Sequence, residues 1–283
     1  MVTLCIINHS SNTVEFYISL DHWPDNQNFI ISALMQHISR YFLETGLHPS
    51  TLFLQLDNCA PTNKNRIMLA WLACLVRYRW FKEVRDSYLM EGHTHEDVDQ
   101  VMAQLWRLIN EGPIYTIDDY ALGIEQQFAR SNYGFRSVRV FHHTTCWDWF
   151  LWLDAFTYTA HGMDTCHGFH VFEYNSDTMS TIAVRARFLN GGVDQYTDPY
   201  KICEAFPASD MPPQVVLTSV FRQHVIAKLF DLFNDDWDDR PDAVTFWRGI
   251  HDDPTSFLQL NTPDNIVINT LTNFVTKLLA VYF

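Results

Sequence analysis

Basic residues are scarce in this sequence. Its 283 residues include 19 Lys and Arg against 33 Asp and Glu, which gives a formal net charge of -14 at pH 7. Binding to DNA without sequence preference depends on Lys and Arg side chains that neutralise phosphates. The composition therefore argues against tight duplex binding by the chain's own surface. It favours an acidic protein, or one that uses its carboxylates to hold cations.

Paired cysteines, a signal peptide and long apolar runs are also lacking. The six cysteines are scattered and form no C-x-x-C pair, so neither a zinc finger nor a disulfide scaffold is indicated. The first residues, MVTLCIINHSSN, lack the charged region and apolar run of a secretion signal. No stretch approaches the roughly 18 apolar residues of a membrane-spanning helix. We therefore predict reduced thiols and a nuclear or cytoplasmic protein that is neither secreted nor membrane-bound.

Glycine-based nucleotide and hydrolase motifs are missing too, because no G-x-S-x-G, P-loop or Rossmann pattern is present. What the sequence does contain is apolar material: 47% of the residues are hydrophobic and 15% are aromatic. That content is typical of a folded chain with a sizeable core.

Apolar periodicity predicts alternating strands and helices along the chain. The predicted strands cover 2–8, 14–20, 51–56, 84–90, 138–142, 169–174 and 181–188. The predicted helices cover 29–44, 63–78, a span from 94 or 95 to 109, 117–129, 215–233 and 265–282. Gly46 is expected to cap the first helix. The proline-containing region 191–213 is interpreted as a linker, and 234–242 as an acidic turn.

Two polar clusters follow the strands at 51–56 and 84–90. The first is Asp57-Asn58-Cys59 with Asn63-Lys64-Asn65-Arg66 behind it, and the second runs from Gly92 to Gln100 as GHTHEDVDQ. The local order is strand, helix, strand, helix, which is typical of a layered α/β sheet. Ligands gather at the carboxyl ends of strands in such sheets. We therefore expect both clusters to belong to a functional site, with His95 and Asp99 on one helix face.

The segments LQLDNCAPTNKNR and GHTHEDVDQ resemble an uncharacterised domain family of transposon-derived eukaryotic proteins. That family looks related to the transposases and integrases of the ribonuclease H-like superfamily, which use an Asp-Asp-Asp/Glu (DDE) set of carboxylates. The resemblance is dense over roughly residues 50 to 110 and faint beyond about residue 190. Met102-Ala103 stands where the family usually has Phe-Ser.

The resemblance implies an α/β fold: a ribonuclease H-like mixed sheet flanked by helices, with a C-terminal α+β extension. It implies a transposase-type core over 1–140, an aromatic-rich helix and strand pair over 141–190, and a linker with a helical extension over 191–283. In the superfamily, a central first strand carries the first catalytic aspartate, and we find no counterpart before the strand at 2–8. We therefore expect a core without that strand, two unpaired sheet edges that invite self-association, and no nuclease activity.

Asp57 and Asp99 are the residues we expect to act as catalytic groups and metal ligands. Phosphodiester cleavage or strand transfer uses Mg²⁺ or Mn²⁺ held by carboxylate oxygens. With only these two carboxylates, we expect the ion to bind weakly if at all. Asp97 is the rival of Asp99, and the resemblance favours Asp99. His95 is the third expected catalytic residue.

The other motif residues leave alternatives open. His93 and His95 either bind a transition metal or, as we prefer, cap the helix and orient substrate. Lys64 and Arg66 either contact a phosphate or are ordinary exposed cations. Asn58, Asn63 and Asn65, together with Lys64, are expected to orient the substrate or the carboxylates.

Two further groups favour structural roles. His142-His143 and Cys166-His167-x-x-His170 fit no common zinc spacing, so we interpret these histidines as structural. The aromatic stretch from His142 to Phe156 indicates a helix packed on the sheet, because aromatic stripes are mostly buried.

Two classes of function compete. The first is a mobile-element transposase or integrase domain whose ancestral, magnesium-dependent reaction on DNA is lost in this chain. The second is a non-catalytic, domesticated fragment that binds protein or nucleic acid. An unrelated acidic binding module is a third class, and the paired motifs argue against it.

Overall fold

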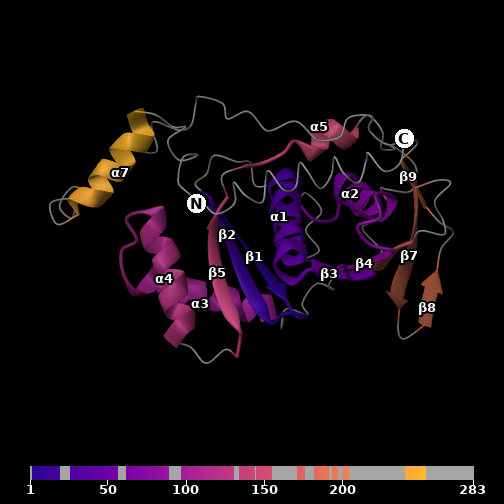
Figure 1. Ribbon diagram of the computed structural model, residues 1–283, viewed down its shortest axis with the longest axis horizontal. Helices are drawn as coiled ribbons and strands as arrows, with labels where there is room; N and C mark the ends of the chain where they lie inside the picture. The colour runs from indigo at the N-terminus through magenta and orange to yellow at the C-terminus, as the bar shows by residue number, and fades with distance from the viewer. Residues whose placement is uncertain are drawn as a thin grey trace. The chain divides into compact units, whose positions relative to one another are not determined.

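Helices and two sheets make up the described part of the protein, which is a mixed α/β structure (Figure 1). The computed structural model describes residues 2–19, 26–56, 62–88, 97–130, 134–143, 145–154, 171–175, 182–190, 193–196, 200–203 and 240–252. The chain forms two compact units, and each combines distant segments of the sequence. The predicted division into 1–140, 141–190 and 191–283 instead follows chain order, and it stays a prediction.

The first unit comprises Met1–Pro24, His95–Cys146 and Val215–Thr262, and it contains a three-stranded sheet. Strand β1 (Val2–Asn8) pairs antiparallel with β2 (Thr13–Ser19) as a hairpin. On its other side, β2 pairs in parallel with β5 (Ser137–His142). The hairpin turn contains Asn12 with a φ of 54°, a left-handed conformation that asparagine tolerates better than most residues.

One face of β2 forms the core of this unit with helices α3 (Asp97–Glu111) and α4 (Ile117–Arg130). Strand alternation places Val14, Phe16 and Ile18 on that face, and each of them is fully buried. The Phe16 ring lies 5.4 Å from the Phe128 ring of α4, centroid to centroid. The helices therefore pack on the sheet through the apolar stripe that the periodicity of the sequence predicts.

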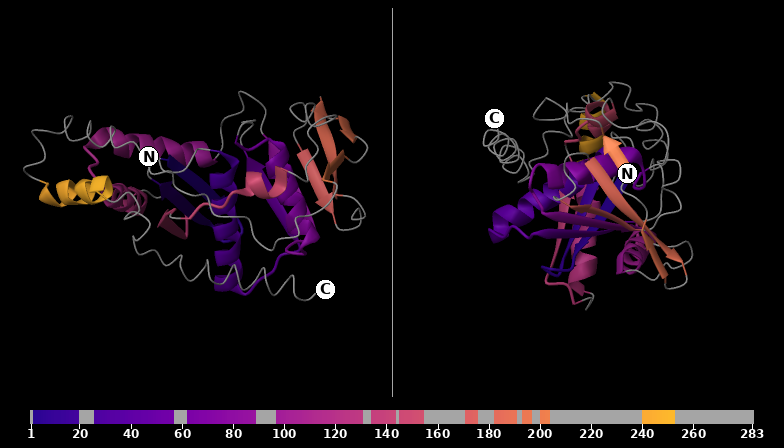
Figure 2. Two further views of the ribbon diagram at one scale, coloured as in Figure 1. Left: turned by 90° about the horizontal axis from the view of Figure 1, so that it is seen from above. Right: turned by 90° about the vertical axis from the view of Figure 1, so that its right-hand side faces the viewer.

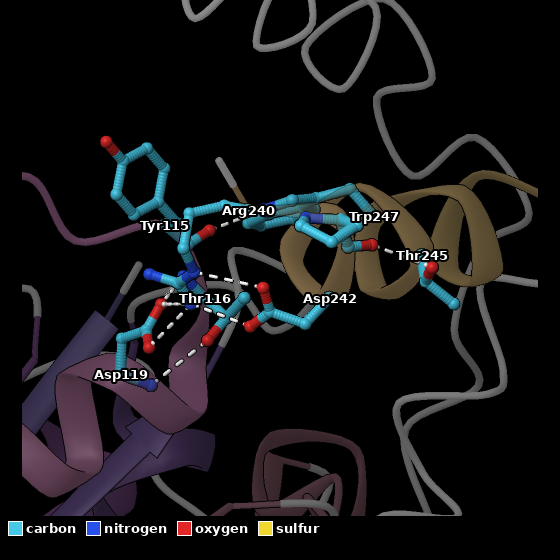
Figure 3. A network of polar contacts seen from close by, with 8 residues as sticks. Tyr115, Thr116, Asp119, Arg240, Asp242, Thr245 and Trp247 are labelled. Atoms are coloured by element: carbon cyan, nitrogen blue, oxygen red, sulfur yellow. Dashed lines mark hydrogen bonds and ion pairs between the residues drawn. The ribbon is translucent and has the colours of Figure 1, made fainter. Parts of the chain in front are cut away.

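Helix α7 (Pro241–Asp252) completes the same core and is tied to the start of α4 (Figure 3). Arg240 Nη2 donates to both carboxylate oxygens of Asp119, at 2.8 and 2.9 Å, and its guanidinium lies 4.8 Å from the centre of the Tyr115 ring. The indole of Trp247 donates to the Tyr115 carbonyl at 2.5 Å. Because Ile250 is also buried in the core, α7 is an integral part of this unit.

The second unit comprises Asp25–Thr94, Trp147–Gln214 and Pro263–Phe283, and it contains a mixed six-stranded sheet. Strands β3 (Thr51–Leu56) and β4 (Glu83–Tyr88) are parallel, with α2 (Arg66–Arg77) as the crossover between them. The sheet continues antiparallel through strands coloured orange in Figure 2: β6 (Val171–Asn175), β7 (Ile182–Asn190), β8 (Val193–Tyr196) and β9 (Tyr200–Cys203). Helix α2 packs against β4, β6, β7 and β9.

Helix α1 (Gln27–Thr45) is buried along most of its length and is joined by hydrogen bonds to the segment around α5 (Trp149–Asp154). Ser32 Oγ accepts from the Trp147 backbone N–H and from the Trp149 indole N–H, both at 3.0 Å. The Asn28 side chain donates to Asp148 at 3.1 Å and accepts from the Phe150 N–H at 2.9 Å. Asn28 and Ser32, two of the buried polar residues of α1, therefore dock the α5 segment.

Most of the elements predicted from periodicity are confirmed, with helix and strand ends shifted by a few residues. Gly46 ends α1 in a left-handed conformation, with a φ of 65°, as expected. Among the described helices, none is long and apolar enough to cross a bilayer. The predicted helices over 215–233 and 265–282 lie outside the described residues.

Two local predictions need correction, and one helix was not predicted. The region 191–213, interpreted as a linker, contains β8 and β9, because its prolines lie outside both strands. The aromatic segment does form a helix, but α5 contacts helices α1 and α2. Helix α7 was not predicted, because the acidic run before it dominates the local pattern.

A serine pair on α1 tests the docking of α5. Replacing Ser32 with alanine leaves two buried N–H donors without their acceptor, so we expect the free energy of unfolding to fall by about 1–3 kcal/mol. Ser39→Ala is the matched control, because the buried Ser39 hydroxyl has no hydrogen-bond partner among the described residues. Thermal and urea unfolding of both variants measure the difference, and equal losses would contradict the docking role.

Candidate functional site

The two sequence motifs follow the carboxyl ends of the parallel strands β3 and β4. The last residue of β3, Leu56, pairs with the last residue of β4, Tyr88, so both strands end at the same level of the sheet. Asp57 and Asn58 come directly after β3 in the sequence, and His93 and His95 follow β4. All four lie outside the described residues, and the predicted approach of Asp57 to Asp99 therefore stays a prediction.

Asp99 lies in the first turn of α3, and its side chain is exposed. Asp97 occupies the same turn and is exposed as well, so exposure does not distinguish the two candidates. Carboxylates are favoured there because the amino end of a helix carries partial positive charge. The described part of α3 begins at Asp97, so the predicted helix start at 94 or 95 and the place of His95 on the Asp99 face lie outside the described residues.

The Asn63-Lys64-Asn65 run forms the start of α2. Asn65 is the N-cap, and its side-chain oxygen accepts from the backbone N–H groups of Ile67 and Met68, both at 3.1 Å. Such a cap is worth about 1 kcal/mol to a helix. The second asparagine of the motif is therefore engaged in local structure, a role that its position before an apolar helix could have indicated.

Lys64 is buried, with only 1% of its surface exposed. One of its two predicted roles, that of an ordinary exposed cation, is therefore wrong. Its Nζ lies 5.2 Å from the centre of the Tyr88 ring, a cation–π contact, and close enough to Asp86 to affect that group electrostatically. Arg66 is paired as well, because it forms a salt bridge with Asp154 of α5 and lies 5.8 Å from the Phe150 ring.

Asp86 and Tyr88 of β4 are two residues that the sequence-based analysis missed. Alternation along EVRDSY places Val84, Asp86 and Tyr88 on the same buried face, with exposures of 0%, 0% and 2%. The Tyr88 hydroxyl donates to the backbone carbonyl of Asn63 at 3.0 Å. The sequence did contain a signal: Asp86 alternates in phase with Val84 and Tyr88, so it was expected on their face of the strand. A carboxylate on a buried face is unusual, because charged residues are seldom fully buried.

The Asp86 carboxyl is held in a strongly desolvated position. Neither oxygen accepts a hydrogen bond of normal geometry from the described residues. Burial raises the pKa of Asp86 to about 8, and the nearby Tyr88 hydroxyl and Lys64 ammonium only partly oppose that rise. Near pH 7 Asp86 is therefore mostly a neutral acid.

The paired histidines His142 and His143 have structural surroundings, in line with the prediction. His143 is fully buried beside Tyr17, with ring centroids 6.1 Å apart, and burial lowers its pKa to about 3. His142 Nε2 lies 3.4 Å from a carboxylate oxygen of Asp118. The Cys166, His167 and His170 group lies outside the described residues.

Within the described ranges, no group of three or more His, Cys, Asp or Glu side chains is placed to hold a metal ion. The expected ligand Asp57 is not among these residues. Of the two expected ligands, only Asp99 is therefore described, and its carboxylate is exposed. Its oxygen atoms are the type of ligand that Mg²⁺ prefers.

These features define a class of mixed α/β protein in which polar motifs follow two parallel strands in the sequence and one of the strands carries a buried acid. The chain belongs to the family described as domain of unknown function DUF7869, whose model matches residues 2–187. That range includes both motifs and ends within β7, before α7. No curated protein and no solved structure matches the chain.

The raised pKa of Asp86 predicts a specific dependence of stability on pH. The folded chain keeps this proton up to about pH 8, whereas the unfolded chain loses it near the ordinary value of 3.8. Between these limits the unfolded state binds fewer protons, so stability falls as the pH rises, by up to about 1.4 kcal/mol per pH unit. Asp86→Asn should flatten this fall and raise stability most near pH 8.

Unfolding curves recorded from pH 4 to pH 9 measure the effect. Asp99→Asn serves as the control, since that side chain is exposed and should leave the slope as in the wild type. An Asp86→Asn variant that is less stable than the wild type at pH 8 would show that the carboxylate is stabilised in the folded state.

Proposed function

We propose that this protein is a transposase- or integrase-like domain of mobile-element origin with a ribonuclease H-like core. Its ancestral reaction is Mg²⁺-dependent cleavage or strand transfer at DNA phosphodiesters, carried by Asp57 and Asp99 with His95 beside them. The single observation that carries the proposal is the parallel pairing of β3 with β4. In the sequence, both motifs follow the carboxyl ends of this strand pair, and α/β sheets bind their ligands at the carboxyl ends of strands.

Further elements support the same assignment. An antiparallel hairpin, β1 and β2, precedes helix α1 and the β3–α2–β4 unit, and helix α3 follows with Asp99 in its first turn. From its second strand onward, the order of elements that the resemblance implies is the same, which supports the proposal. Family membership adds no function by itself, because the family's function is unknown.

The proposed chemistry requires more carboxylate ligands than Asp57 and Asp99 supply. Two-ion phosphoryl transfer spreads the charge of two divalent cations over several carboxylates. Asp86 lies on the strand that leads to the second motif, but it is buried and mostly protonated near pH 7, so it adds no ligand. The chain by itself is therefore expected to bind one Mg²⁺ or Mn²⁺ weakly and to have no nuclease activity.

A non-catalytic binding role is the alternative function, and the surface of the first unit favours it. Trp106 on α3 and Leu122 on α4 are exposed by 64% and 53%, which is high for side chains of this size and type. Among the described strands, β1 and β3 each have one neighbour only. Strand edges of this kind favour self-association, which is a separate expectation for this chain.

A metal titration with labelled DNA tests the catalytic part of the proposal. We expect no cleavage above background in Mg²⁺ or Mn²⁺ with single-stranded, duplex or nicked substrates, because two carboxylates cannot hold both ions. Mn²⁺ binding should be weak in the wild type and weaker still in the Asp57→Ala and Asp99→Ala variants. Cleavage by the wild type that Asp57→Ala abolishes would contradict the expected inactivity and reveal another carboxylate.

Charge determines a further expectation for DNA. Because the net charge is -14, the isolated chain should bind duplex DNA with a Kd above about 10 μM at physiological salt, and more weakly as salt rises. Gel-shift titrations at several NaCl concentrations measure this. Tight binding that resists salt would show that the chain concentrates its few basic side chains on one surface.

A further inference from the structure

Tyr88 contacts the chain on both sides of the first motif. On one side, its backbone pairs with Leu56, the last residue of β3. On the other side, its hydroxyl donates to the carbonyl of Asn63 at 3.0 Å. Residues 57–62, which include Asp57-Asn58-Cys59, connect these two points in the sequence. One residue of β4 therefore holds both described flanks of the motif segment, Leu56 through its backbone and Asn63 through its side chain.

The attachment on the Asn63 side is buried and reinforced. Tyr88 and Lys64 are exposed by only 2% and 1%, and the Lys64 ammonium lies 5.2 Å from the centre of the Tyr88 ring. The next residue, Asn65, caps α2. In a low-dielectric interior these contacts are stronger than at the surface, and leaving one of them unmade is costly. The start of α2 is thus attached to β4 independently of the residues between.

We propose that Tyr88 is a positioning residue for the Asp57 motif: its hydroxyl holds the Asn63 end of the segment at the level where β3 ends. This inference rests on the proposed function for its metal-binding consequence. Because both flanks of the segment are attached to one residue, fewer chain conformations are available to it, and its carboxylate should lose less conformational freedom on binding an ion. Because Tyr88 is proposed to act through its bond to Asn63, its role is that of a positioning residue and not of a catalytic one.

The Tyr88→Phe variant removes the hydroxyl and keeps the ring, the burial and the strand pairing. We expect its affinity for Mn²⁺ to fall by about tenfold, the usual effect of losing a contact that orients a ligand. Tyr120→Phe is the matched control, because the Tyr120 hydroxyl also bonds to one described partner, Thr3 at 3.3 Å, in the other unit. Both variants should have similar Tm values, and the control should bind Mn²⁺ as the wild type does.

Trypsin cleavage after Lys64 provides a second measurement that does not depend on metal. Because Lys64 is buried in the folded protein, cleavage there requires the turn before α2 to open locally. Losing the hydrogen bond to Asn63 should raise that opening by about fivefold in Tyr88→Phe and leave it unchanged in Tyr120→Phe. Mass spectrometry of the first fragments identifies the cleaved bond.

The two measurements separate the two proposals. If the wild type binds no Mn²⁺, the proposed metal chemistry fails, and faster cleavage after Lys64 in Tyr88→Phe still supports the positioning role. If Tyr88→Phe binds Mn²⁺ as tightly as the wild type, the positioning role is overturned. Where no metal binds, cleavage after Lys64 at the wild-type rate overturns it as well.

Discussion

The parallel pairing of β3 with β4 is the constraint on which the second unit depends. Parallel neighbours cannot be joined by a tight turn, so the chain must cross over between them, and here α2 makes that crossing. The crossing brings the start of α2 close to the carboxyl ends of both strands. The described motif residues of this unit, 63–66, lie at that start of α2.

Burial of polar groups follows from this arrangement. Because β4 alternates, the same face that buries Val84 must also bury Asp86 and Tyr88 against α2. The Tyr88 hydroxyl donates to the Asn63 carbonyl, whereas the Asp86 carboxyl is desolvated. Asp86 therefore keeps its proton to a higher pH than an exposed aspartate does. Burying the acid lowers the stability of the folded chain at neutral pH. The neighbouring residues Lys64 and Tyr88 attach the turn before α2 to β4.

The boundary of the family does not coincide with the boundary of the first unit. The family model ends at residue 187, yet Ala243 and Ile250 of α7 are buried, and Arg240 binds the capping residue Asp119 of α4. Asp119 and Thr116 cap α4 by reciprocal hydrogen bonds of 2.9 and 3.0 Å. A segment outside the family match therefore supports the core on which α3, the helix of Asp99, is packed.

Local periodicity and capping residues determined much of this protein from the sequence alone. They predicted β1 to β4, α1, α2 and α4 closely, because each has a clear apolar pattern and a turn or cap at its ends, such as Gly46. The order of motifs after β3 and β4 was equally visible. Only the tertiary structure decided that β5 pairs with β2, that Lys64 points into the protein, and that Asp86 is buried. These are contacts between residues distant in sequence, and periodicity reports which face of an element is apolar but not which element covers it.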